Sequence, residues 1–303
     1  MSKLIIDKLN KQAEKDKKLF IEKSEEKYFK QLSSIIKDAV KNKVKFIFVS
    51  GPSSSGKTTT AKYLCAMIES YKMHSNYVSL DDFFKNRADT PLLPNGEKDF
   101  ESLNALNIEE MQRCFSELLK NGVATFPKYD FFTGINTKNV NKIRLTNNSI
   151  VVIEGNHAFN PMVTQCVDGE KFIRVFVHPE HEFANSNRET VIDIYTLRLI
   201  RRTIRDVGNR GYKPEHTFQM WNTVRDGEVK YIYPYKHLAD YVINTTYAYE
   251  VMVYKTILDK LLKNSKSEIS KNLVNLVSPF NEIDVTEIPK NSLMWEFLSN
   301  LKL

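Results

Sequence analysis

A chain of 303 residues is long enough for one large domain or two modest ones, and its hydrophobic fraction of 42% and charged fraction of 27% are ordinary for a globular protein. Its apolar runs, such as 46–49 and 150–153, are far shorter than the roughly 20 residues of a membrane-spanning helix, and its charged start is no secretory signal. Three isolated cysteines indicate no disulfide framework. We therefore expect a cytoplasmic protein without a membrane partner.

The net charge of +7 is concentrated near the N-terminus. Residues 1–45 contain 13 lysines and 7 acidic residues, a balance of +6 that leaves about +1 for the rest of the chain. Apolar residues from Tyr28 to Val40 recur at helical spacing, so we predict a helix over 24–42 with a solvated, Lys-rich face. A nucleic-acid or other acidic partner is the less favoured alternative, and a homo-oligomer remains open.

The remaining chain alternates between β-branched or aromatic runs and amphipathic runs. We predict strands over 44–50, 77–80, 149–153, 172–177 and 241–244, and helices over 58–70, 108–120, 190–206 and 251–262. Between them, Pro91, Pro94 and Gly96 indicate a loop over 85–104. This alternation predicts an α/β fold in which a parallel sheet has helices on both faces, preceded by an N-terminal helical extension.

A glycine-rich loop joins the first predicted strand to the next helix. The loop reads Gly51-Pro52-Ser53-Ser54-Ser55-Gly56-Lys57-Thr58, which fits GxxxxGK followed by Ser or Thr without a mismatch, and Thr59 comes next. In such a loop, backbone N–H groups bind phosphates, Lys57 reaches the β- and γ-phosphates, and the Thr58 hydroxyl holds Mg²⁺. We therefore predict a P-loop NTPase fold that binds ATP and Mg²⁺.

Carboxylates follow two of the predicted strands, at the sheet edge where open α/β sheets bind ligands. Glu154 ends the strand 149–153 and would complete the Mg²⁺ site, although a turn-capping role is the simpler alternative. Asp81 and Asp82 follow the strand 77–80. Either could accept the proton of an alcohol during phosphoryl transfer. Because adjacent extended residues point to opposite sides, only one can face the γ-phosphate.

Four arginines share one face of the predicted helix 190–206, namely Arg198, Arg201, Arg202 and Arg205, and Arg210 follows. Such a face repels itself unless an anion lies beside it, and bidentate guanidinium groups suit phosphate. We predict a mobile lid over ATP at about 190–211, in which Arg201 and Arg205 stabilise the transferring group. An exposed basic face paired with Asp193 and Asp206 is the alternative.

Together these motifs resemble the uridine kinase branch of the uridine kinase/phosphoribulokinase family. The resemblance covers about 45–262 and rests on the P-loop, Ser79 to Phe84, Pro127 to Phe131, Val152 to Gly155, and Arg198 to Gly211. It implies Mg²⁺- and ATP-dependent phosphorylation of a nucleoside 5′-hydroxyl, with Asp81 as the base and Arg198 and Arg202 on ATP. The substrate contacts that it implies are Asp81, Phe84, Glu101, Tyr129, Phe131, Arg198 and Arg210.

The chain departs from that pattern on the acceptor side. Gly134 stands where uridine and cytidine kinases of the family usually carry a pyrimidine-reading His, and Glu101 stands where an aspartate is usual. The predicted loop around Tyr129 and Phe131 offers rings for a nucleobase, although core packing is an equal alternative. Another small hydroxyl substrate therefore competes with a nucleoside as the acceptor, and a nucleotide-binding switch without turnover is a third reading.

The resemblance suggests three parts for the chain. They are a Lys-rich helical extension (1–43), a P-loop kinase domain (44–263) and a C-terminal segment of unassigned role (264–303).

Overall fold

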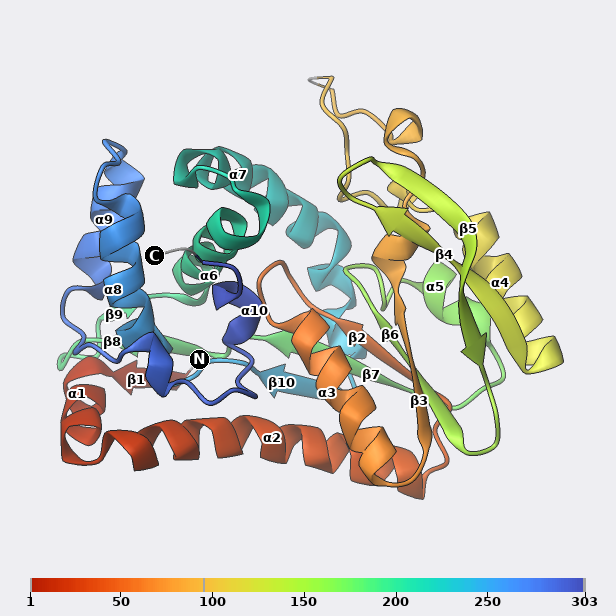
Figure 1. Cartoon of the computed structure of the whole chain (residues 1–303), viewed down its shortest axis with the longest axis horizontal. Coiled ribbons are helices and arrows are strands. Elements are labelled where there is room, and N and C mark those ends of the chain that lie inside the picture. Colours follow the sequence, from red (N-terminus) through yellow and green to blue (C-terminus); the bar gives the residue numbers. More distant parts are fainter. Residues whose placement is uncertain (1, 95, 302–303) are drawn as a thin grey trace.

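Five parallel strands form the central sheet of the computed structural model, which describes residues 2–94 and 96–301 (Figure 1). The strand order is β10-β7-β2-β6-β3. In chain order the strands are β2 (Phe46–Ser50), β3 (His74–Ser79), β6 (Ser149–Glu154), β7 (Phe172–His178) and β10 (Tyr241–Asn244). The predicted parallel α/β sheet is confirmed, and each predicted strand is present within a few residues of its expected bounds.

The side chains of β2 alternate between two separate cores. Ile47 and Val49 join the core beneath α2 (Lys17–Lys41), α3 (Lys57–Ser70) and α8 (Glu250–Leu262). Phe46 and Phe48 join the core beneath α4 (Ile108–Asn121) and α5 (Pro161–Thr164). All four side chains are fully buried, as expected for a central strand covered on both faces.

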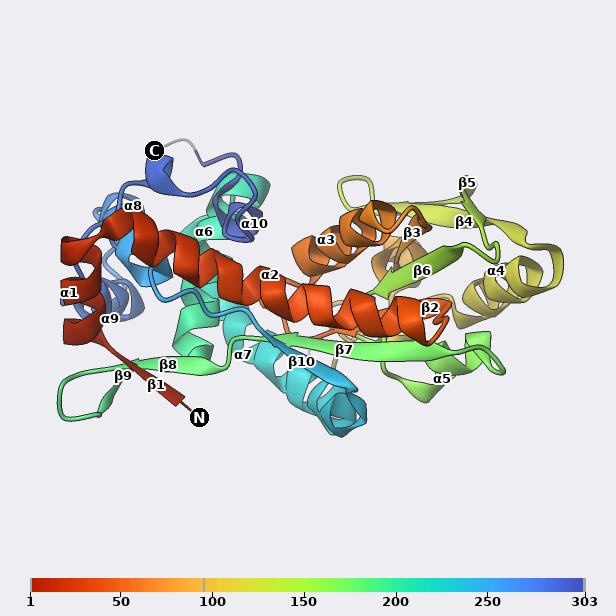
Figure 2. The same cartoon turned by 90° about the horizontal axis from the view of Figure 1, so that it is seen from below.

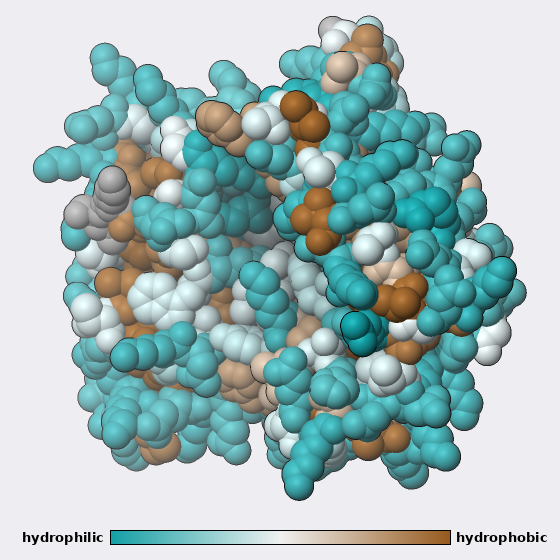
Figure 3. All heavy atoms as spheres, turned by 45° about the vertical axis from the view of Figure 1, so that its right-hand side comes forward, coloured by the Kyte–Doolittle hydropathy of each residue, from teal (hydrophilic) through white to brown (hydrophobic). Residues whose placement is uncertain are grey.

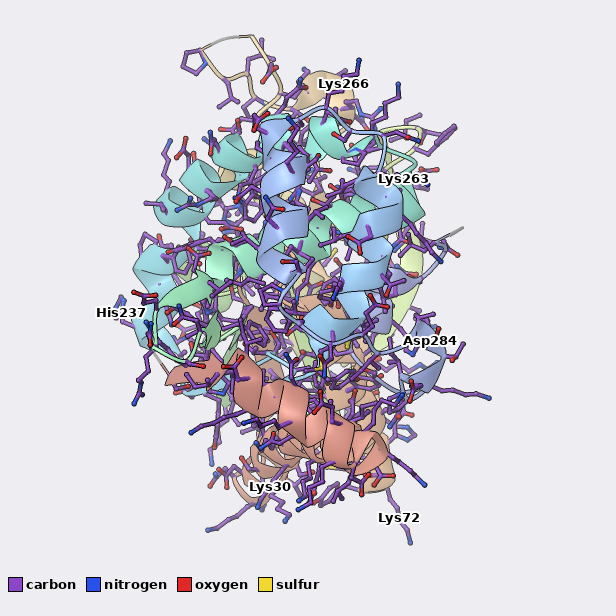
Figure 4. The ribbon with its side chains drawn as sticks, turned by 90° about the vertical axis from the view of Figure 1, so that its left-hand side faces the viewer. Lys30, Lys72, His237, Lys263, Lys266 and Asp284 are labelled. Atoms are coloured by element: carbon purple, nitrogen blue, oxygen red, sulfur yellow. The ribbon has the colours of Figure 1, made fainter. Side chains whose placement is uncertain are left out.

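In the N-terminal extension, the main helix begins at Lys17 rather than at the predicted residue 24, and a strand and a shorter helix precede it. The extension contains β1 (Ser2–Ile5), α1 (Ile6–Lys15) and α2, and the Asp16 side chain caps α2 by accepting the Leu19 N–H at 3.0 Å. Figure 2 shows α2 running past α3 and the sheet. Lysines on its outer face are exposed, and Lys30 projects away from the molecule in Figure 4. The solvated Lys-rich face is therefore present.

Two further β-structures were not predicted from the sequence. β1 pairs in parallel with β8 (His181–Ala184), which pairs with β9 (Thr190–Ile192). β4 (Val123–Asp130) and β5 (Ile135–Arg144) form an antiparallel hairpin at the right of Figure 1. The segment around Tyr129, predicted as a loop, is thus the end of a strand.

Apart from β10, the regular elements of the chain after β9 are helices. The helices are α6 (Ile194–Arg210), α7 (Pro214–Tyr231), α8, α9 (Glu268–Val277) and α10 (Trp295–Leu298). The predicted start of α6 at residue 190 is wrong, because 190–192 pair as β9 and the Asp193 side chain caps the helix by accepting the Thr196 N–H at 2.7 Å. None of the described helices is long and apolar enough to cross a membrane.

Candidate phosphoryl-transfer site

The P-loop leaves β2 at Ser50 and enters α3 at Lys57, as predicted. A Cβ atom at Gly51 would lie 2.1 Å from the Val177 carbonyl oxygen, so only glycine fits there. Gly56 has φ +94° and Ser54 has φ +56°, a conformation that residues with a Cβ atom rarely adopt. The loop therefore holds a strained backbone at the point where a ligand is expected.

Polar groups in this loop suit a phosphate. The hydroxyl groups of Ser54 and Ser55 are buried and have no hydrogen-bond partner within the described residues. The side chain of Lys57 is buried, and its ammonium group donates to the Pro52 carbonyl oxygen at 3.0 Å. A buried cation and unpaired hydroxyl donors at a helix N-terminus form an anion-binding site.

Three carboxylates interact electrostatically with Lys57, namely Asp81, Glu101 and Glu154. Burial raises the pKa of all three, to about 7 for Glu101 and Glu154, and Lys57 opposes each rise. Tyr77 of β3 donates its hydroxyl to Glu154 at 3.1 Å. Asp81 and Glu154, the acids expected at this edge of the sheet, therefore interact with the P-loop lysine, and Glu101 from the loop 85–104 joins them. Within 2–94 and 96–301, no three His, Cys, Asp or Glu side chains gather as a metal-binding cluster.

The two adjacent aspartates have different environments. They lie in a 3₁₀ turn, Leu80–Phe83, rather than at an extended strand end, so the prediction that their side chains point to opposite sides of an extended chain is wrong. Asp82 is bound to the hairpin, because the Lys128 ammonium group lies 3.0 Å from its carboxylate. Asp81 interacts most strongly with Lys57 and then with Asp82. Of the pair, Asp81 is the one directed electrostatically at the P-loop.

Two arginines of α6 are neutralised one to one. Arg198 bonds to Glu228 of α7, and Arg201 bonds to Glu250 of α8 at 2.8 Å. All four side chains are almost completely buried. Arg201 also donates to Thr245, so the expectation of a guanidinium group free for phosphate is not met there. This half of the arginine face is part of the core.

Three other arginines share a single carboxylate. Asp206 lies 3.3 Å from Arg202, 3.2 Å from Arg205 and 3.3 Å from Arg210. The pKa of Arg205 falls to about 10 through burial and repulsion from Arg210. Arg202 in turn interacts with Glu101, and Arg210 with Asp81. The ion-pair partner that these three guanidinium groups share is Asp206, so the one-to-one pairing of Arg198 and Arg201 is absent in this half of the arginine face.

Aromatic rings gather on the hairpin side of the site. The Tyr129 ring lies 5.0 Å from that of Phe131 and 5.5 Å from that of Phe84, measured between centroids. Tyr129 is buried and its hydroxyl has no partner within the described residues, whereas Phe131 is 59% exposed. Figure 3 turns this side of the molecule forward and shows a mostly hydrophilic face with isolated hydrophobic side chains. Core packing thus describes Tyr129, whereas the exposed ring of Phe131 is accessible to a ligand.

Gly134 occupies a tight turn between β4 and β5. Its φ is +73°, and a Cβ atom there would lie 2.7 Å from the Arg87 Cβ. Arg87 also bonds to the Phe131 carbonyl oxygen through its guanidinium group. Arg87 therefore fills the space that a larger side chain at position 134 would need.

Comparison with known proteins identifies the family. The model of the phosphoribulokinase/uridine kinase family matches residues 46–251, well over half of the chain. The chain belongs to this family. Its relatives include the uridine kinases of Borrelia duttonii (25% identical, covering 75% of this chain and 98% of the relative) and Ligilactobacillus salivarius (25% identical, 67% and 85%).

Solved structures of related kinases align at low similarity. A possible uridine kinase from Bacillus stearothermophilus is 18% identical with a TM-score of 0.48, covering 71% of this kinase and 98% of that chain. A D-glycerate 3-kinase from Cryptococcus neoformans is 17% identical with a TM-score of 0.41, covering 61% and 78%.

Several residues of the kinase site were not predicted from the sequence. Glu228 accepts the Ser53 N–H at 2.8 Å, and Glu296 accepts the Thr59 N–H at 3.0 Å. Tyr77 binds Glu154, and Glu250 binds Arg201. The arginine face called for carboxylate partners, which Glu228 and Glu250 supply, but no local pattern in the sequence linked residue 296 to the P-loop.

Proposed function

We propose that this kinase transfers the γ-phosphoryl group of ATP to the 5′-hydroxyl of a nucleoside, with uridine and cytidine as the first candidates. The observation that carries the proposal is the separation of two adjacent aspartates. Asp82 is bound to Lys128, while the strongest charge interaction of Asp81 is with the P-loop Lys57. A carboxylate beside the γ-phosphate position is what an alcohol acceptor requires.

The reaction follows from these positions. Asp81 accepts the proton of the acceptor hydroxyl, and the oxygen forms a bond to the γ-phosphorus. The bond between the γ-phosphorus and the β–γ bridging oxygen breaks, and ADP leaves. Lys57 and the backbone of residues 51–59 hold the phosphates, while Arg205, with Arg202 beside it, stabilises the charge on the transferring group. Arg198 and Arg201 keep α6 in place through their buried ion pairs.

Mg²⁺ fits the residues beside the P-loop. Thr58 at the start of α3 and the buried Glu154 offer a hydroxyl and a carboxylate, the hard oxygen donors that Mg²⁺ prefers. We assign these two residues to the metal. When bound with ATP, Mg²⁺ would neutralise charge on the β- and γ-phosphates.

The acceptor lies on the hairpin side in this proposal. Phe131, Tyr129 and Phe84 offer ring surfaces to a base, and Glu101, Asp81 and Arg210 offer polar contacts to a sugar. Gly134 and Arg87 favour a second candidate, another small hydroxyl substrate, because Arg87 takes the room beside the turn. A nucleotide switch without turnover is disfavoured by Asp81. A cytoplasmic role in pyrimidine salvage accompanies the first candidate.

A coupled assay of ADP release tests the proposal. Purified protein with Mg²⁺ and ATP is given uridine, cytidine, adenosine, guanosine and simple sugars in turn, with Lys57→Ala as the control. We expect uridine or cytidine to release ADP at the highest kcat/KM and Lys57→Ala to abolish release. Turnover with sugars alone would replace the nucleoside assignment, and ADP release by none of them would support the switch.

A further inference from the structure

The C-terminal segment 289–301 lies against the P-loop, although the family match ends at residue 251. A Cβ atom at Gly56 would lie 2.6 Å from the Leu293 side chain, so the two residues are in direct contact. The Tyr63 hydroxyl of α3 donates to the Asn291 carbonyl oxygen at 2.6 Å. Leu293 and Phe297 are fully buried, and Phe297 packs under the Arg201 guanidinium group. The segment is therefore a fixed wall of the P-loop region.

This wall places a carboxylate on a P-loop amide. Glu296 accepts the Thr59 N–H at 3.0 Å. Thr59 is the third residue of α3, so its N–H has no partner within the helix. The first amides of a P-loop helix are donors to the α- and β-phosphates of a nucleotide. Glu296 thus takes a donor that the nucleotide would use.

Glu228 is a second carboxylate that binds a P-loop amide, and its contacts hold it in place. It accepts the Ser53 N–H, is almost completely buried and is ion-paired with Arg198. Glu296 differs in each respect that matters for exchange. Its side chain is only partly buried, and the Thr59 N–H is the one described hydrogen-bond donor to its carboxylate. It interacts electrostatically with Arg201 and Arg205 but forms no ion pair with them, because their ion-pair partners are Glu250 and Asp206. Its displacement would break one hydrogen bond and expose little apolar surface.

We propose that Glu296 sets the nucleotide affinity of this kinase by competing with a phosphate of ATP for the Thr59 N–H. The inference rests on the proposed binding of ATP at the P-loop. On binding, the Glu296 side chain turns away while Leu293 and Phe297 stay packed. Removal of its charge also removes repulsion between this carboxylate and the incoming phosphate. Loss of Glu296 therefore tightens binding, the reverse of what a ligand-contacting residue would do.

Isothermal titration calorimetry with the full chain tests this competition. The ligands are MgATP and inorganic tripolyphosphate, and the variants are Glu296→Gln and Glu287→Gln. Glu287 is a matched control, since it belongs to the same C-terminal region but pairs with Lys17 at 2.7 Å. A carboxylate at a helix N-terminus contributes about 1 kcal/mol, so we expect Glu296→Gln to lower the Kd of both ligands about fivefold. Glu287→Gln should match the wild type.

The outcomes separate this inference from the proposed function. Wild type that binds MgATP while Glu296→Gln binds no more tightly overturns the competition alone. Tighter MgATP binding without tighter tripolyphosphate binding assigns Glu296 to the nucleoside and also overturns it. Failure of every protein to bind either ligand removes the ATP assignment and this inference with it. If Glu296→Gln melts at a lower temperature than wild type, Glu296→Asp is the second variant, because it keeps the charge but is one methylene shorter. The inference then requires that Glu296→Asp bind MgATP with a Kd below that of wild type.

Discussion

The two sides of the P-loop differ in how deeply their side chains are buried. On the nucleotide side, Arg198 and Arg201 each have a buried carboxylate partner, and the C-terminal segment covers Gly56. On the acceptor side, Phe131 is 59% exposed and the Tyr129 hydroxyl has no partner within the described residues. The first side is built into the core, and the second is formed by a hairpin and loops.

This difference has a physical basis. Phosphate binding requires charges and amides held in a fixed geometry, which buried ion pairs and a packed helix provide at the cost of desolvation. Recognition of an acceptor depends on shape and on a few polar contacts, and loops carry such contacts on a rigid scaffold. We therefore expect variants on the two sides to fail in different ways, one through stability or kcat and the other through KM.

The largest effect is expected at the boundary between the two sides. Asp81→Asn should lower kcat by about 10²- to 10⁴-fold, because a general base contributes that much. The Kd of ATP should barely change, because the P-loop and Lys57 hold the phosphates. Steady-state kinetics and calorimetry on Asp81→Asn and Asp82→Asn measure the contrast. A larger loss of kcat at Asp82 would move the base to the residue bound by Lys128.

On the nucleotide side, Arg201 and Arg205 should separate stability from catalysis. Arg201→Ala leaves Glu250 buried and unpaired, which is expected to lower the free energy of unfolding by about 3–5 kcal/mol. Arg205→Ala leaves Asp206 with two arginine partners, so it should lower kcat with a smaller change in stability. Urea unfolding and ADP-release kinetics on both variants check this. Equal loss of stability at the two positions would contradict the division of the arginine face.

The pH dependence of stability tests the buried carboxylates. Burial raises the pKa of Glu154 to about 7, so the folded state favours its protonated form. The stabilisation is complete below the unfolded pKa and is lost as pH rises through about 7. Between pH 4.5 and 8, the free energy of unfolding of the ligand-free wild type should therefore fall by about 1–3 kcal/mol more than that of Glu154→Gln.

Thermal melts of the two proteins across that pH range provide the measurement, with the exposed Glu170→Gln as the control. If the melting temperatures of wild type and Glu154→Gln changed in parallel with pH, the ionised form of Glu154 would not destabilise the fold.

The smallest effect is expected on the acceptor side. Phe131→Ala should raise the acceptor KM about 3- to 10-fold, because an aromatic contact is worth about 0.5–1.5 kcal/mol. Phe132→Ala is the matched control, since its neighbouring ring is 94% exposed. The KM of ATP should stay constant in both variants. A similar rise in acceptor KM for Phe132→Ala would place the nucleobase of the acceptor on the outer face of the hairpin turn.

The sequence by itself determined the fold class and the P-loop with the strand and helix that flank it. The P-loop is a contiguous motif, so Gly51 to Thr58 and the strand and helix around it were predictable from local spacing. The period of the apolar residues likewise predicted the parallel sheet. The placement of Asp81 and Glu154 near Lys57 followed from one rule, that parallel strands end at a common edge. Glu101 lies in the loop 85–104, and only the family resemblance named it.

Tertiary structure alone decided which charges are free. Five arginines look alike in the sequence, yet Arg201 is neutralised by Glu250 and Arg205 shares Asp206 with two others. The same holds for Glu296, which reaches the P-loop across 237 positions of sequence. Spacing along one helix determines which side chains share a face, whereas their ion-pair partners come from distant elements that fold against that helix. Because a buried charge without a partner is costly, an arginine with a buried carboxylate partner serves the core, and an arginine without one of its own is free for a ligand.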